Sequence, residues 1–377
     1  MNKKITISIF AVASVIIIVI ILSIIIKGNK LGSGKTEDEY WIAYFAPSYT
    51  SISYGNTDAQ IIKIDKLGNV EIYEEKAYPF SQLINYKDKV LYQSNKGIVC
   101  LNSKNNMDNV VSDKNTVGYN MADILENKDL FYFLLNEAFK DDYYSSNIII
   151  GNEEKQTLHQ IEGFVNSYGD DGGNIYLNTS DMKNKYYKQI QKISINGQED
   201  ISIKKNDIIL DTIINSNNKI IVEGGYIYNF CVKEHHGISM LKISSDTLEL
   251  KSVSDLIKFD SEEDNDKFYP ISPSSIFYNQ GKIYYPMLGG EVYSFDIKSN
   301  KFIKEFSIKD YRFNVDTNIL SFYSNTDSEI YFLYYDKERN KYCLNIYSLE
   351  GGLKDKIYLD KLNVKSKNYP HSFIKSK

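Results

Sequence analysis

A pair of repeated strand–turn–strand phrases constrains the fold of this chain more than any other sequence feature. The first phrase has an apolar run, a polar tip and a second apolar run containing Ile-Tyr or a similar pair. Runs rich in Tyr, Ile, Phe and Val that are broken by Asn, Asp, Gly and Lys favour strands, so each copy is predicted to be a hairpin. The copies are LINYKDKVLYQ (83–93), ILENKDLFYFLL (124–135), FVNSYGDDGGNIYLN (164–178), IINSNNKIIVEG (213–224), IFYNQGKIYYPM (276–287) and ILSFYSNTDSEIYFLYY (319–335).

A second hairpin phrase follows each copy of the first and has Asn, Ser, Asp or Gly at its tip. An additional copy comes earliest in the chain. Two hairpins make four antiparallel strands, which is the blade of a β-propeller. The copies are QIIKIDKLGNVEIYEE (60–75), GIVCLNSKNNMDNVVSD (97–113), NIIIGNEEKQTLHQI (147–161), QIQKISINGQEDISIKK (189–205), GISMLKISSDTLELKSV (237–253), GEVYSFDIKSNKFIKEFSI (290–308) and YCLNIYSLEGGLKDKIYL (342–359).

The two ends of the repeat region predict how the ring closes. Only one strand, YWIAYF (40–45), precedes the earliest second phrase, and YPHSFIKSK (369–377) matches YPFSQLINYKDK (78–89). We therefore expect the C-terminal strand to complete the first blade, which would remove a free sheet edge. The expected fold is all-β, a propeller of about seven four-stranded antiparallel blades over residues 40–377. Six or eight blades stay open, because the step from Ile214 to Phe277 is long.

This repeat architecture resembles the broad WD-repeat and quinoprotein-like propeller superfamilies of bacterial secreted and membrane-anchored proteins. The resemblance covers residues 40–377. The Trp-Asp dipeptide of WD repeats is absent, since Trp41 is the only tryptophan, and the tryptophan docking motifs of quinone-dependent dehydrogenases are missing. The resemblance therefore implies a fold and carries over no active-site residue.

An uncharged apolar run at residues 5–26 is predicted to be one transmembrane helix that acts as an uncleaved signal anchor. Its 22 residues match a bilayer core of roughly 30 Å. Ala11 and Ala13 lie too early in the run for a signal-peptidase site. We expect residues 1–4 to be a short cytoplasmic head, 27–39 a juxtamembrane linker and the propeller to lie outside the cytoplasm, as a single-pass cell-membrane protein.

Charge and residue usage exclude several function classes. Five lysines precede residue 36, so the remaining chain carries 39 basic and 49 acidic side chains, which argues against nucleic-acid binding. The three cysteines lie in apolar contexts and are predicted to be buried without disulfides. The adjacent His235 and His236 point in opposite directions in an extended chain, and the acidic run 260–266 lacks EF-hand spacing. We predict no metal and no cofactor.

Candidate binding residues follow from the propeller axis, where the innermost strand of each blade begins. The two residues before each of these strands are mostly polar, among them Gln82, Ser274 and Ser372. Either they line a water-filled channel with no ligand or the charged ones bind a ligand or ion. The charged candidates are Asp123, Glu162, Asp211 and His371.

The loops between blades add aromatic and basic candidates. Arg312 could pair a carboxylate or phosphate in two-pronged fashion, or it could simply pair with Asp310 or Asp316. Exposed tyrosines suit carbohydrate or peptide recognition. The tyrosine candidates are Tyr78, Tyr119 and Tyr269.

Three functions fit these features. The chain is predicted to be a membrane-tethered extracytoplasmic binding or scaffold protein, monomeric, that recognises a protein or cell-envelope component through the propeller face. An alternative is an extracytoplasmic hydrolase or lyase with carboxylate, His or Tyr groups at the channel mouth; several carboxylates with shifted pKa values would support it. A third is an assembly platform for another membrane protein, which a large exposed apolar patch would favour.

Overall fold

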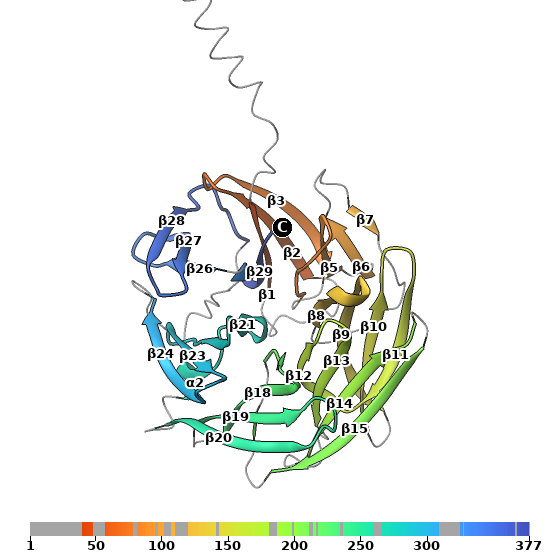
Figure 1. Ribbon diagram of the computed structural model, residues 1–377. Helices are drawn as coiled ribbons and strands as arrows, with labels where there is room; N and C mark the ends of the chain where they lie inside the picture. Colours follow the sequence, from red (N-terminus) through yellow and green to blue (C-terminus); the bar gives the residue numbers. More distant parts are fainter. Residues whose placement is uncertain are drawn as a thin grey trace, which may run out of the picture. The chain divides into compact units, whose positions relative to one another are not determined.

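The described residues between 40 and 376 form antiparallel β-sheets fanned around a common axis in the computed structural model (Figure 1). The described residues fall into sixteen stretches of the chain. The structure describes residues 40–47, 57–77, 81–94, 97–101, 107–109, 120–140, 143–180, 187–197, 200–210, 214–215, 218–233, 237–259, 265–308, 325–326, 328–365 and 368–376.

Five separate sheets contain strands that follow one another along the chain, as the paired hairpins predict. In the sheets that begin with β8, β12 and β21, the first strand lies nearest the axis and the last lies outermost (Figure 1). The first two of these sheets consist of β8 (Asn120–Leu125), β9 (Leu130–Lys140), β10 (Tyr143–Gly151) and β11 (Gln156–Glu162), and of β12 (Phe164–Asp170), β13 (Asn174–Ser180), β14 (Tyr187–Ile195) and β15 (Ile201–Ile209).

The other three separate sheets repeat this arrangement, with one extra short strand. They consist of β16 (Ile214–Asn215), β17 (Ile221–Glu223), β18 (Tyr226–Lys233), β19 (Gly237–Ser244) and β20 (Leu250–Lys258); of β21 (Phe277–Asn279), β22 (Lys282–Pro286), β23 (Glu291–Asp296) and β24 (Lys301–Ser307); and of β25 (Asn325–Thr326), β26 (Glu329–Asp336), β27 (Lys341–Ser348) and β28 (Leu353–Tyr358).

The remaining eight described strands form a single sheet, so the described residues contain five separate blades beside this joined sheet, and the expectation of seven separate blades is corrected to five. A single residue pair, Ala77 with Ser94, joins two four-strand groups of this sheet. Both residues are small and buried, which lets their backbones approach and pair. The strands are β29 (Asn368–Lys375), β1 (Tyr40–Pro47), β2 (Thr57–Asp65) and β3 (Val70–Ala77), followed by β4 (Ile84–Tyr86), β5 (Lys89–Ser94), β6 (Gly97–Leu101) and β7 (Met107–Asn109).

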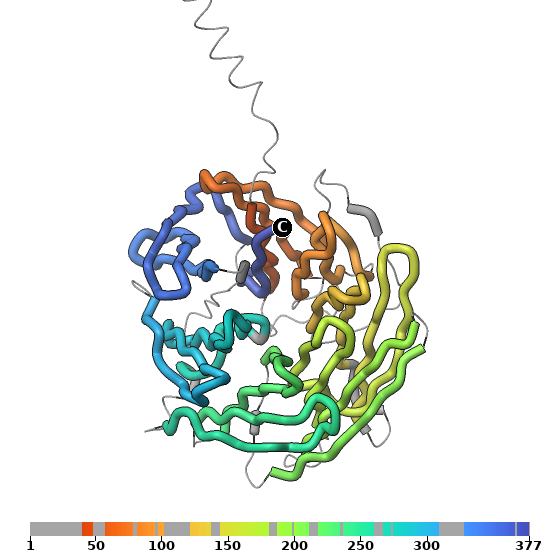
Figure 2. Tube along the Cα trace, in the orientation of Figure 1, coloured from red at the N-terminus to blue at the C-terminus, as the bar shows by residue number. Residues whose placement is uncertain are grey.

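The C-terminal strand closes the ring, as the sequence predicts. Strand β29 pairs antiparallel with β1, with Ile374 opposite Ile42, and β1 pairs on its other side with β2. Figure 2 shows the last segment of the chain lying beside the first described strand. The register shifts between Tyr44 and Phe45, which pair with Ser372 and Pro370, so His371 is the extra residue of a β-bulge.

Apolar side chains between neighbouring sheets form the core. In one cluster Leu134 and Ile148 of one sheet pack with Tyr168 and Ile193 of the next. Middle strands such as β13 are buried on both faces, whereas outer strands such as β20 are exposed or half-buried along their length. Packing of adjacent sheets therefore accounts for the high Tyr, Phe and Ile content, because each sheet must bury two faces.

One predicted hairpin is wrong. Residues 213–224 do not fold back on themselves: β16 and β17 both pair with β18, and the turn comes later, at Gly224 and Gly225. Both glycines have positive φ, which a tight two-residue turn between Glu223 and Tyr226 requires. The innermost strand of this sheet is thus split into two pieces, which lengthens the spacing between Ile214 and Phe277.

The predicted anchor at residues 5–26, with its flanking segments, lies outside the described residues. Within the described stretches no helix is long and apolar enough to cross a membrane. All three cysteines are buried and none is in a disulfide, as expected. His235 and His236 lie outside the described residues, and no cluster of metal-ligating side chains occurs among those that are described.

Candidate functional site

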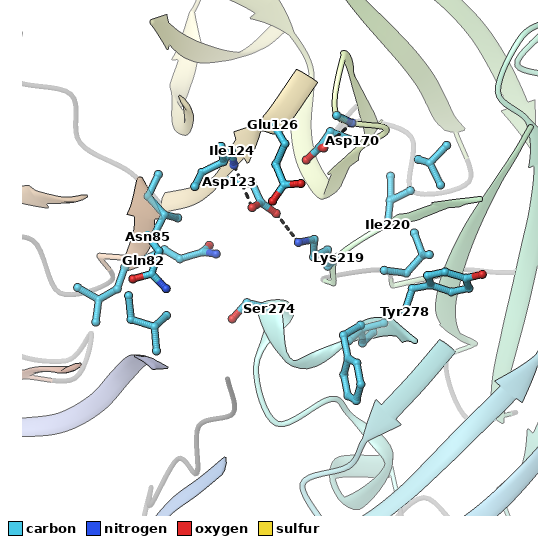
Figure 3. A pocket seen from close by; sticks show the side chains of 18 of the residues that line it. Gln82, Asn85, Asp123, Ile124, Glu126, Asp170, Lys219, Ile220, Ser274 and Tyr278 are labelled. Atoms are coloured by element: carbon cyan, nitrogen blue, oxygen red, sulfur yellow. Dashed lines mark hydrogen bonds and ion pairs between the residues drawn. The ribbon is translucent and has the colours of Figure 1, made fainter. Parts of the chain in front are cut away.

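A cavity of about 590 Å³ lies among the innermost strands, at the axis of the sheets. Its wall combines apolar side chains with a charged group at one side (Figure 3). The wall is built from the N-terminal part of β4, the end of β8, the turn after β12, the start of β17, the start of β21 and the middle of β29.

The turn after β12 places two carboxylates at the cavity. The Asp170 carboxylate accepts a hydrogen bond from the Gly172 backbone N–H at 2.9 Å. Asp171 accepts bonds from the backbone N–H groups of Gly173 and Asn174 and from the hydroxyl of Tyr176. Asp favours such turns because its side chain bonds to the backbone two residues on.

A close approach of two backbones positions Lys219 at the cavity. Tyr168 of β12 forms a parallel bridge with Lys219, and the Ile220 N–H donates to the Tyr168 carbonyl at 2.6 Å. A Cβ at Gly169 would lie 2.1 Å from the Ile220 carbonyl oxygen, so only glycine permits this approach. The chain from one sheet is thereby held against the inner strand of the next.

Lys219 forms an ion pair with Asp123 of β8 inside the cavity (Figure 3). The two side chains are 30% and 24% exposed. Burial alone would lower the pKa of Lys219, but the negative charges of Asp123 and Asp170 outweigh it and raise that pKa above its usual value. Lys219 is therefore protonated at neutral pH and acts as a fixed positive charge, not as a nucleophile.

At Asp170 the surroundings favour the neutral form, whereas at Lys219 they favour the charged form. Burial and the nearby Asp123 carboxylate raise the pKa of Asp170 to about 6, although the Lys219 ammonium, the Gly172 N–H and the Tyr132 hydroxyl all favour its charged form. The Tyr132 hydroxyl donates to Asp170 at 3.1 Å. Asp170 can therefore gain or lose a proton near neutral pH.

Gln82 fixes the backbone next to Asp123. Its amide donates to the Ala122 carbonyl at 2.9 Å and accepts from the Ala122 N–H at 3.1 Å. The Tyr168 hydroxyl also donates to Gln82, at 2.9 Å. One side chain thus ties three sheets together beside the Asp123–Lys219 pair.

Ser372 and Asn85 join the opposite wall of the cavity. The Leu83 N–H donates to the Ser372 hydroxyl at 3.0 Å, and the Asn85 amide donates to the Lys375 carbonyl at 2.7 Å. These bonds link β4 to the closing strand β29. Gln82 and Ser372, the polar residues that precede Leu83 and Phe373, therefore stabilise the walls around the axis.

Asp123 is the one predicted charged candidate that the described structure places in the cavity. Glu162 ends the outermost strand β11, is 67% exposed and pairs with Lys205 at 2.9 Å. Glu162 shows that a residue shortly before an inner strand, here β12, can belong to the outermost strand of the preceding sheet, here β11.

His371 and Tyr269 are not among the residues that line the cavity. The His371 Nε2–H donates to the Ala46 carbonyl at 3.0 Å, and burial lowers the pKa of His371 to about 4. The β-bulge turns this side chain toward β1, so His371 is not placed to meet a ligand in the cavity. The Tyr269 carbonyl accepts from the Leu288 N–H at 2.8 Å.

Four other candidates lie outside the described residues. They are Asp211, Arg312, Tyr78 and Tyr119.

Lys219, Asp170 and Glu126 were not predicted from the sequence, although Figure 3 shows them directed toward the same space as Asp123. The candidates from the sequence lie before the inner strands, whereas Asp170 ends β12, Glu126 follows β8 and Lys219 lies between β16 and β17. The charged DDGG tip of the hairpin at 164–178 is the one signal that pointed to this end of the strands.

Comparison with known families identifies the fold class. The family model for the YycP beta-propeller domain matches residues 35–373. The chain belongs to this family. No curated protein matches the sequence.

Solved structures share the propeller fold at low sequence identity. The apocarotenoid oxygenase of Synechocystis is 8% identical with a TM-score of 0.53, and the match covers 86% of this chain and 90% of that one. A puromycin hydrolase is 9% identical with a TM-score of 0.51, covering 84% and 51%.

A quinoprotein alcohol dehydrogenase-like protein of Bacteroides thetaiotaomicron is 12% identical with a TM-score of 0.47, covering 90% and 91%. The family match confirms the predicted resemblance to bacterial β-propeller proteins. At these identities the likeness concerns the fold alone.

Proposed function

We propose that this YycP-family propeller is a membrane-tethered binding protein outside the cytoplasm, which takes a protein or cell-envelope ligand at its axial cavity. The cavity carries this proposal, because it combines apolar walls with a cluster of partly buried charges. Cavities with these properties are the usual location of binding sites.

The apolar run at 5–26 supports the tether, since it is long enough to span a bilayer. Protease added to intact cells tests the orientation. We expect the protease to cleave the propeller of the full chain in intact cells. A variant that lacks residues 5–26 is the control, and its propeller should be protected in intact cells. A propeller that is cut only after the cells are opened would refute the proposed location.

Binding is favoured over covalent catalysis by the chemistry of the cavity wall. Lys219 is held protonated by its acidic neighbours, and neither His nor Cys occurs among the described residues that line the cavity. The two serines in the wall face other protein groups: Ser372 accepts from Leu83, and Ser274 lies 3.2 Å from the Ser272 hydroxyl.

Capture from envelope extracts tests the binding role. The full chain in detergent, the double variant Asp123→Asn/Asp170→Asn and the control Glu162→Gln would be immobilised in parallel. A ligand of the cavity is retained by the wild type and by the control, and is lost from the double variant. Equal retention by all three proteins would place binding elsewhere and overturn the proposal.

A hydrolase or lyase is the second candidate, and the Asp170 carboxyl is the observation that favours it. A carboxyl with a pKa of about 6 can serve as a general acid or base near neutral pH. Turnover of envelope polysaccharide by the full chain, abolished in Asp170→Asn and retained in Glu162→Gln, would support this activity. Full turnover in Asp170→Asn would exclude an acid–base role for this residue.

The assembly-platform alternative finds no support in the described surface. Its large exposed apolar side chains come from five different sheets or their turns, one from each. They are Leu67, Ile209, Val253, Ile303 and Leu353.

A further inference from the structure

Lys219 reveals the chemistry that the cavity can hold, since its ammonium group on an alkyl chain is paired with Asp123 and lies in the field of Asp170. We propose that the axial cavity binds a second, external alkylammonium group, a primary amine on an apolar chain, beside Lys219. This inference rests on the proposed binding function and names the class of ligand.

The charges of the wall favour a cation. Among the described residues that line the cavity, four carry carboxylates and one carries an ammonium group. Asp171 is engaged by its own turn, and Asp123 and Asp170 face the space around Lys219 (Figure 3). Two carboxylates around one ammonium leave negative charge that a bound cation would neutralise.

The apolar part of the wall favours an alkyl chain on that cation over a bare metal ion. Ile220, Ile276 and Phe277 line the same cavity as the carboxylates, and Tyr278 lies on the far side of Lys219 from Asp123 in Figure 3. A hydrated metal ion would gain nothing from these surfaces, whereas an alkyl chain buries apolar area against them. An amine with about five carbons is one carbon longer than the four-carbon stem of the lysine already present.

Protonation of Asp170 couples this binding to pH. The groups that face Asp170 are Asp123 from β8, Tyr132 from β9, the Gly172 N–H and the Lys219 ammonium, and Glu126 contributes to the field at Lys219. An incoming ammonium favours the charged carboxylate, so binding should release a proton below about pH 6. The affinity is therefore expected to rise as the pH increases from 5 to 7.

Calorimetry on the full chain in detergent tests the proposal with n-pentylamine, and with 1-pentanol and pentanoate as uncharged and anionic counterparts. We expect n-pentylamine to bind at least roughly tenfold more tightly than either counterpart, since a hydrogen bond to a charged group contributes more than a neutral one. Asp170→Asn should weaken the amine by a similar factor, and Glu162→Gln should leave it unchanged. Equal binding of the amine and the alcohol would overturn the proposal.

A second variant separates ligand binding from a structural ion pair. In Lys219→Met, the carboxylates lose their internal cation, so n-pentylamine should bind more tightly and should raise the melting temperature of the variant more than that of the wild type. A structural role alone predicts the same small effect of the amine on both proteins. That result would contradict the inference.

Two further probes distinguish the source of the amine. Cadaverine represents a free amine, and Nα-acetyl-lysine N-methylamide represents a lysine presented by a protein, with the norleucine analogue as its control. Preference for the lysine amide indicates a protein ligand. If no amine binds but capture from envelope extracts still depends on Asp123 and Asp170, this inference fails and the proposed binding function stands.

Discussion

The closing sheet and the axial cavity share strand β29 but are stabilised in different ways. At the closing sheet, Ile42 and Tyr44 are fully buried, and Phe373 packs in the apolar cluster with Trp41 and Phe45. At the cavity, the same strand faces a wall of carboxylates, amides and one lysine. The comparison separates a region held by apolar burial and strand pairing from a region whose polar groups are retained at an energetic cost.

Removal of residues 368–377 should have the largest effect on the closing sheet. The deletion exposes the edge of β1 and the apolar cluster that Phe373 covers, so we expect loss of cooperative unfolding in thermal and denaturant melts. Removal of residues 376–377 leaves β29 intact and should preserve the transition. A cooperative melt of the larger deletion near the wild-type temperature would show that closure is dispensable.

Phe373→Ala tests the same sheet without deleting backbone. Phe373 is 2% exposed, and truncating a buried phenylalanine typically costs about 3–5 kcal/mol of unfolding free energy. Leu353→Ala is the matched control, because Leu353 is 44% exposed and its loss should cost below about 0.5 kcal/mol. Urea denaturation measures both values, and equal costs would contradict the packing argument.

His371 makes the closing sheet sensitive to acid. Its pKa is lowered to about 4 in the folded protein, so between pH 6.5 and 4 the unfolded chain takes up a proton that the folded chain does not. Stability should therefore fall with decreasing pH across this window, by about 3 kcal/mol from this residue. His371→Gln should flatten this part of a pH series of urea melts, and an unchanged slope would refute the assignment.

Asp170 should give the cavity the opposite pH response, with a smaller effect. Its pKa is raised to about 6, so between pH 4 and 6 the folded protein holds a proton that the unfolded chain has lost, and stability should fall as the pH rises. Asp170→Asn removes this penalty of about 3 kcal/mol at pH 7 but weakens the Tyr132 and Gly172 hydrogen bonds, so the net stabilisation should be about 2 kcal/mol. Destabilisation that is equal at pH 4 and pH 7 would contradict the raised pKa.

The contrast also explains which parts of the molecule could be predicted from the sequence. The hairpins and the pairing of β29 with β1 followed from local alternation and from the match between 369–377 and 78–89. The split inner strand could not be predicted, because Asn215 and Lys219 look like the two sides of a turn until β18 pairs with both neighbouring segments. The joined eight-stranded sheet depends on one contact, between Ala77 and Ser94.

The candidate site was predicted least well. Asp123 was found because it precedes the apolar pair of an inner strand, but His371 and Glu162 met the same rule and lie elsewhere. A one-residue bulge redirected His371, and Glu162 belongs to the outer strand that ends just before the next inner strand begins. Such displacements depend on strand register, which one residue can shift.

The sequence by itself determined the all-β propeller and the partnership of its first and last strands, because alternating apolar runs and polar turns act over a few neighbouring residues. The tertiary structure alone decided that Lys219, Asp123 and Asp170 share a cavity. These residues come from three sheets, and their charges interact only after Gly169 admits the Ile220 backbone and the sheets pack around the axis.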